Sequence, residues 1–247
     1  MEWSEEGVIL GTRRHGESSA MVELFTRRRG RHLGIVRGGR SKRLQVVLQP
    51  GNLVTATWRA RLEDHLGNFA IELDRGGAAT LMESSHALYG FAVAVSHLRL
   101  LAEREPHEGL YDTFRLLLDC LPEEVAGAVA LARFELTILA DLGFGLDLTE
   151  CAATGETDDL VWVSPRSGRA VSRTAGEPYA DRLLRLPGFL SDGQTTANAP
   201  SPEELQDAFA LTGFFLERHV LEPRGLVMPA ERVRMLRVLR SAAADGR

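Results

Sequence analysis

Basic side chains gather in one part of the sequence, and the chemistry they offer is the binding of phosphate or carboxylate oxygens. Between positions 13 and 61 stand twelve arginines and lysines but only two acids, Glu17 and Glu23, which gives this stretch a net charge of +10. The whole chain of 247 residues has a net charge of −5, so the remainder carries −15. A local surface of one sign on an acidic molecule attracts polyanions such as nucleic acids. An ordinary solvated charged face is the alternative explanation.

We predict nucleic-acid contacts from nine of these side chains. They are Arg13, Arg14, Arg27, Arg37, Arg40, Lys42, Arg43, Arg59 and Arg61. In segment 54–61, small or apolar residues alternate with threonine and arginine, so Arg59 and Arg61 stand together on the solvated face of a strand. The same alternation predicts Trp58 in the core, whereas Phe25 is a candidate for stacking on a base.

No residue pattern in the sequence carries catalysis. The segment 34–41 imitates a phosphate-binding P-loop, but Arg40 stands where that motif needs a lysine, and we expect no helix of useful length after it. The seven histidines show neither the helical two-histidine spacing of a zinc enzyme nor a cysteine at ligand spacing. No nucleophile elbow surrounds a serine, and no carboxylate pair stands out from the solvated acids. We therefore predict a protein that is not an enzyme.

Composition sets further bounds on the class of protein. Hydrophobic residues make up 44% and charged residues 26%, which permits a substantial core in one or two domains. No apolar run is long enough for a membrane helix, and the acidic N-terminus does not resemble a signal peptide. Two cysteines, Cys120 and Cys151, are too few for a disulfide framework. We expect a cytoplasmic, reduced protein without a membrane partner.

Short segments rich in Val, Ile, Phe and Thr, separated by turn residues, predict five strands in the first part of the chain. Their ranges are 8–14, 19–27, 32–36, 53–61 and 69–73. Five short strands in about seventy residues fit a small closed barrel, of which the OB fold is the common oligonucleotide-binding example.

After position 78 the hydrophobic period changes to that of helices. We expect helices over 84–105, 108–121, 122–142, 201–220 and 230–239, the third ending at Gly143 and the fourth capped by Ser201. Segment 146–200 loses the period and predicts an irregular insert with short strands near 160–163 and 170–172 and an exposed loop at 191–200. The predicted class is α+β: an OB-fold β-barrel domain at 1–78, then a helical domain at 79–247.

Several blocks resemble the RecO family of recombination mediators. The first is GVILGTRRHGESS at 7–19, followed by LFT at 24–26, VRGGR at 36–40 and LQPG at 48–51. The second runs from RFEL at 133–136 through LGFG at 142–145 to CAATG at 151–155. The resemblance implies an N-terminal OB fold, binding and annealing of single-stranded DNA, and work with RecR and the single-strand-binding protein (SSB) to load recombinase.

The sequence departs from that family at its zinc site. Many members carry two Cys-x-x-Cys pairs, but here Thr154 follows Cys151 and segment 164–172 has no cysteine. One thiolate cannot make the four-ligand site that zinc prefers, so we predict no zinc and no other cofactor.

The resemblance also implies that the helical domain takes the acidic tail of SSB. Arg133 is the candidate residue for this contact, and a surface arginine within a helix is the equal alternative. The functional hypothesis is a non-enzymatic, single-stranded-DNA-binding mediator of recombination in DNA repair. The alternative is a binding module whose basic face docks an acidic protein partner.

Overall fold

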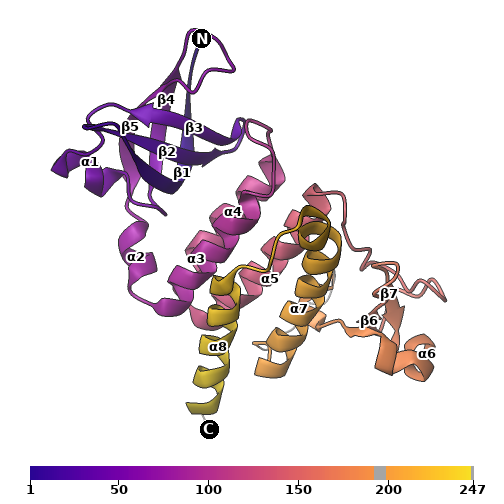
Figure 1. The fold of residues 1–247 in the computed structure, drawn as a ribbon. Coiled ribbons are helices and arrows are strands. Elements are labelled where there is room, and N and C mark those ends of the chain that lie inside the picture. The colour runs from indigo at the N-terminus through magenta and orange to yellow at the C-terminus, as the bar shows by residue number, and fades with distance from the viewer. Residues whose placement is uncertain (192–198, 246–247) are drawn as a thin grey trace. The chain divides into compact units, whose positions relative to one another are not determined.

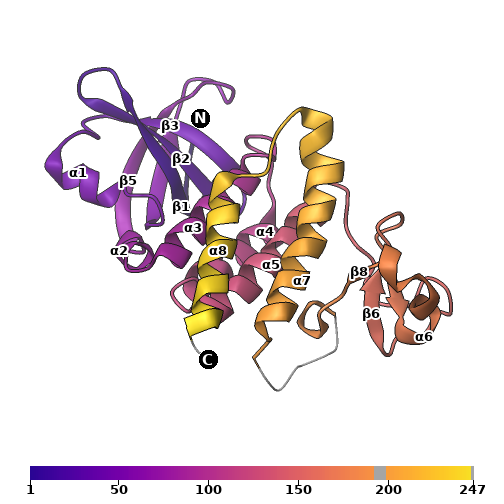
Figure 2. The same ribbon diagram turned by 60° about the horizontal axis from the view of Figure 1, so that its bottom comes forward.

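A computed structural model describes residues 1–191 and 199–245 of the chain (Figures 1 and 2). The chain divides into two compact units, Met1–Pro122 and Glu123–Arg247. The expected boundary at 78 is where the strands give way to helices, and the helices up to 122 belong to the same compact unit as the barrel. In the described ranges, no helix is long and apolar enough to cross a membrane.

The first unit is built on a closed five-stranded barrel in the order β1-β2-β3-β5-β4, as expected for an OB fold (Figure 1). The strands are β1 (Glu2–His15), β2 (Ser19–Thr26), β3 (Gly30–Val36), β4 (Leu53–Arg59) and β5 (Asn68–Arg75). Neighbours pair antiparallel except β3 and β5, whose parallel pairing at Ile35 and Asn68 closes the barrel. The predicted α+β class with an OB-type barrel is thus confirmed.

The first strand is longer than the sequence pattern suggested. It begins at Glu2 rather than at position 8, and its first half pairs with β4, with Glu2 opposite Arg59 and Trp3 opposite Trp58. The run of acids at the N-terminus hid this strand, because only its alternate residues are shielded. Trp58 is 1% exposed and lies in the barrel core, as predicted.

Besides the short helix α1 (Lys42–Val47), the first unit contains the helices α2 (Ala78–Met82), α3 (Ser85–Leu98) and α4 (Glu108–Cys120). The predicted helix 84–105 ends at Leu98, and Arg104, with a φ of +65°, turns the following segment so that its N–H bonds to the carbonyl of Arg31. Phe25 is fully buried, so the expectation that it stacks on a base is wrong. Its ring points out of the barrel and packs against Tyr111 and Phe114.

The second unit contains two long helices, α5 (Glu124–Asp141) and α7 (Pro202–Phe215), and the C-terminal helix α8 (Ala230–Asp245) (Figure 2). Helix α5 ends just before Gly143, whose φ is +86°, and α7 begins with the predicted capping box between Ser201 and Glu204. A π-helical turn, Leu216–Leu221, and a 3-10 turn, Glu222–Arg224, follow α7.

The insert forms a small sheet in the order β7-β6-β8. Its strands are β6 (Leu160–Val163), β7 (Ala170–Ser172) and β8 (Leu184–Arg185), with α6 (Arg173–Gly176) and 3-10 turns at Glu177–Arg182 and Gly188–Leu190. The two predicted short strands are confirmed. Most of the loop expected at 191–200 lies outside the described residues.

A buried ion pair ties the helices of the second unit together. Arg232 of α8 donates to Glu135 of α5 through Nε (2.7 Å) and Nη2 (2.9 Å), and it also donates to the carbonyl of Phe209 on α7. The Thr212 hydroxyl also donates to Glu135. The side chains of Glu135 and Arg232 are 0% and 6% exposed. Water therefore does not reach the two charges, and each is stabilised by the other instead.

Candidate nucleic-acid interface

A hollow of about 580 Å³ opens at one end of the barrel, between the β1–β2 turn and the loop that joins β3 to helix α1 (Lys42–Val47). We call it the basic hollow. Three arginines line it, Arg13, Arg14 and Arg40, against a single acid, Glu17. Six of the nine predicted site residues are not part of its lining. Arg37, Lys42 and Arg43 lie next to the lining in the sequence, whereas Arg27, Arg59 and Arg61 do not.

Backbone hydrogen bonds hold the two walls of the basic hollow together. The N–H of Arg40 donates to the carbonyl of Ser18 in the β1–β2 turn, and the N–H of Gly39 donates to Val36. Gly38 turns the loop with a φ of +67°, a conformation that glycine adopts without strain. Ser41 then caps α1 by accepting from the N–H of Leu44. This six-residue helix is short, in keeping with the expectation that no helix of useful length follows the glycine loop.

The arginines of the basic hollow are oriented by neutral acceptors. Arg13 donates to the thioether of Met21, its cross-strand partner, through Nε at 3.0 Å and Nη2 at 2.8 Å. Arg40 donates to the carbonyl oxygen of Glu17. Neither acceptor carries a formal charge, so both guanidinium groups keep their positive charge available to an anion.

The remaining basic residues at this end of the barrel are exposed. Arg14, Arg37, Lys42 and Arg43 make no hydrogen bond or ion pair through their side chains within the part of the chain that the structure describes. Lys42 and Arg43 occupy the first turn of α1, where the helix dipole disfavours cations. Their charge therefore does not serve the stability of this helix.

Two predicted site residues are instead paired with acids, and the expectation of a single free basic surface from 13 to 61 is corrected to that extent. Arg27 pairs with Asp112 (3.1 Å) and with Glu108, and Arg59 pairs with Glu2 (2.7 Å). The hydrogen bond from Arg27 lowers the pKa of Asp112, and that from Arg59 lowers the pKa of Glu2. Both acids come from segments that the strand pattern could not place beside the basic stretch.

Arg61 lies just past the end of β4, exposed and without an ion pair in the described residues. The alternation predicted for β4 holds, since Val54, Ala56 and Trp58 are buried while Arg59 is exposed. Of the nine predicted residues, the six in and beside the basic hollow have no ion pair within the described ranges, Arg61 stands apart from them, and Arg27 and Arg59 are neutralised.

The residues present do not fit a zinc site. The Sγ of Cys151 accepts a hydrogen bond from the N–H of Ser172 at 3.2 Å, and the Thr154 hydroxyl is bonded to Glu156. Burial raises the pKa of the Cys151 thiol, but hydrogen bonds from Ser172, Thr154 and Ala153 outweigh it and bring the pKa to about 6. Across the described ranges, no group of three or more His, Cys, Asp or Glu side chains could hold a metal ion.

Arg133 lies on α5 with an exposed side chain that is partly fixed. Its Nη2 donates to the carbonyl of Phe189 at 2.9 Å, and its Nε to the same oxygen at 3.3 Å. In the described part of the chain no carboxylate pairs with it, so its charge remains available to an anionic partner.

Comparison with known proteins relates both parts of the chain to the same kind of protein. The family model described as Recombination protein O N terminal matches residues 1–73, and Recombination protein O C terminal matches residues 84–226. The chain is 59% identical over 226 residues to the DNA repair protein RecO of Rhodopseudomonas palustris strain TIE-1, covering 91% of this chain and 90% of the relative. It is 56% identical over 232 residues to DNA repair protein RecO of Brucella abortus strain 2308, covering 94% and 93%.

Proposed function

This chain belongs to the RecO family of DNA repair proteins, and from that premise we propose that it binds single-stranded DNA and anneals it as a recombination mediator. In this role it helps to load recombinase on SSB-coated DNA, and it works without a bound metal or cofactor. Both relatives are named as DNA repair proteins, and neither name gives an enzymatic activity.

The observation that carries the proposal is the basic hollow and the unpaired cations beside it. Arginines oriented by neutral acceptors present donors that a phosphate can take over without first breaking an ion pair. Cations that neutralise phosphates lower the repulsion between two DNA strands, which is what annealing requires. Because aromatic side chains such as Trp58 and Phe25 are buried, base stacking contributes little, and we expect weak sequence preference.

The proposed partners are single-stranded DNA, SSB and RecR. For SSB, the exposed guanidinium of Arg133, held by one carbonyl on one edge, offers donors to carboxylates of an acidic tail. The competing proposal is that the basic hollow docks an acidic protein and that DNA binding is incidental.

The experiment that tests DNA binding compares two double variants with the same change of charge. R14A/R37A removes two arginines that have no ion pair with any residue the structure describes, whereas R59A/R75A removes two that are paired with Glu2 and Asp119. Each single-strand phosphate contact contributes about 0.7 to the slope of log affinity against log salt. We expect R14A/R37A to lose about 1.4 of that slope and roughly tenfold in affinity at physiological salt, measured by fluorescence anisotropy.

R59A/R75A should stay close to the wild type in affinity and in slope. Equal losses in the two variants would mean that net charge alone, and not the basic hollow, governs binding. Failure of the wild type to bind single-stranded DNA at physiological salt, together with binding to an acidic peptide, would favour the acidic protein partner.

A further inference from the structure

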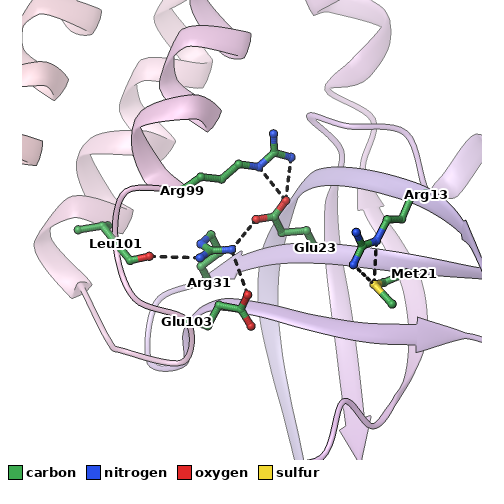
Figure 3. A network of polar contacts seen from close by, with 7 residues as sticks. All are labelled: Arg13, Met21, Glu23, Arg31, Arg99, Leu101 and Glu103. Carbon is green, nitrogen blue, oxygen red and sulfur yellow. Dashed lines mark hydrogen bonds and ion pairs between the residues drawn. The ribbon is translucent and has the colours of Figure 1, made fainter. Parts of the chain in front are cut away.

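A second hollow, of about 410 Å³, lies on the outer face of β2 and β3 and shares Thr12 and Arg13 with the basic hollow. Figure 3 shows the side chains at its centre: Glu23 points between Arg31 and Arg99, with Arg13 and Met21 to one side. Arg99 comes from outside the barrel, at the C-terminal end of α3. The two hollows thus form one continuous surface with Arg13 at their junction.

Glu23 is the residue around which the second hollow is organised. It is only 8% exposed, and both of its carboxylate oxygens are occupied. Oε1 accepts from Nη1 of Arg31 at 2.9 Å, and Oε2 accepts from Nε and Nη2 of Arg99 at 3.1 and 2.8 Å. A carboxylate removed from water is stable only with such bonds, and here two arginines supply them.

The two arginines differ in what they have left to offer. The side chain of Arg31 is 13% exposed, and it also donates to the carbonyl of Leu101 at 3.2 Å and lies 3.5 Å from Glu103. Arg99 is 51% exposed and uses only its Nε and Nη2 toward Glu23. A guanidinium carries five N–H donors, so Arg99 keeps an outer edge open to solvent.

Because Nη1 of Arg31 also lies 3.5 Å from Glu103, Arg31 and Arg99 together balance the charges of Glu23 and Glu103. Glu23 fixes the orientation of Arg99, and the outer edge of this guanidinium keeps N–H donors that an anion from solvent can accept. Arg99 approaches β1 closely at Gly11: a Cβ built at this position would lie 3.0 Å from Nη2 of Arg99, so a larger residue there would displace the guanidinium slightly. The β-bulge between Ile9 and Gly11 lies at the same place.

We propose that Arg99 is a further DNA contact, which binds a backbone phosphate of a single strand that leaves the basic hollow across β2 and β3, and that Glu23 is its positioning residue. The inference rests on the proposed function and extends the binding site from the barrel loops to the end of α3. A strand long enough to cover both hollows would touch Arg99, whereas a short one seated in the basic hollow would not.

The test uses a ladder of oligothymidylates from about 4 to about 24 nucleotides, a range that brackets the footprint of an OB fold. We expect R99A to bind the shortest oligomers like the wild type. It should bind the long ones about fourfold more weakly at 0.15 M salt, with a salt slope smaller by about 0.7, as expected for the loss of one phosphate contact. R99K, which keeps the charge but loses the two-pronged contact with Glu23, should recover only part of the affinity.

R75A is the matched control, since Arg75 is similarly exposed (55%) and also pairs with one acid, Asp119, but lines neither hollow. Circular dichroism melting of R99A and R75A checks that both fold. If R99A and R75A bind all lengths with the same affinity and slope while the wild type binds DNA, Arg99 serves only to hold the helix to the barrel, and the inference is overturned. A wild type that binds no single-stranded DNA would overturn both this inference and the proposed function. Loss of binding in R14A/R37A, together with wild-type affinity and salt slope in R99A, would overturn this inference alone.

Discussion

His32 makes the stability of the barrel depend on pH in a way that can be worked out from its surroundings. The ring is 3% exposed and lies edge-on to Trp3 and Trp58, with centroids 5.1 Å away in both cases, and beside Phe69 at 5.9 Å. Neither ring nitrogen has a hydrogen-bond partner among the described residues. Burial lowers the pKa of His32 from 6.5 to about 4, and the nearby Arg104 and Arg29 act in the same direction.

The direction of this pH dependence follows from the number of protons bound by the folded and the unfolded state. In the unfolded chain His32 takes up a proton as the pH falls through 6.5, whereas in the folded barrel it stays neutral until about pH 4. The unfolded state therefore binds more protons in this window, and the stability present above pH 6.5 is lost as the pH falls toward 4. The shift corresponds to a loss of about 2 kcal/mol at pH 5 and about 3 kcal/mol below pH 4.

The assay is urea unfolding at pH 7.5 and pH 5, followed by tryptophan fluorescence in a W162F background, so that the signal comes from Trp3 and Trp58 beside His32. Carboxylates also contribute to the pH dependence of stability, so the change in unfolding free energy between the two pH values is compared between variants. H32L should lose about 2 kcal/mol less than the wild type between the two pH values. H65L, which removes an exposed histidine, should keep the wild-type dependence. An H32L protein with the wild-type pH dependence would refute the account of a buried neutral imidazole.

Two further predictions concern the second unit. E135L leaves the Arg232 guanidinium buried without its carboxylate and should destabilise this unit by roughly 3–5 kcal/mol, whereas E135L/R232M should recover most of the loss. Urea unfolding followed by Trp162 fluorescence measures both, and equal destabilisation in the two variants would contradict the ion-pair argument. Dialysis against a chelator should leave the unfolding midpoint unchanged, because hydrogen bonds satisfy the Cys151 thiol without zinc. Elemental analysis that finds one zinc per purified chain would contradict this expectation.

Much of the secondary structure could be predicted from the sequence, because helices and strands are set by residues close together in the chain. Alternation of apolar and polar residues identified the barrel strands, the 3.6-residue period identified the helices, and Ser201 and Gly143 marked a start and an end. The strand pattern also placed Trp58 in the core, since side chains on a strand alternate between its faces. It missed residues 2–7 of β1, whose acids mask their pairing with β4.

The tertiary structure decides which of the basic side chains are paired with acids and which are not. The sequence by itself determined that positive charge is concentrated between positions 13 and 61. Which of those charges are free depends on acids brought close by folding: Asp112 of α4 neutralises Arg27, and Glu2, which is 57 residues away in the chain, neutralises Arg59. Likewise Phe25 points out of the barrel but is covered by a helix. Ion pairs, and the covering of side chains that point out of the barrel, arise between segments remote in the chain, and no local period records them.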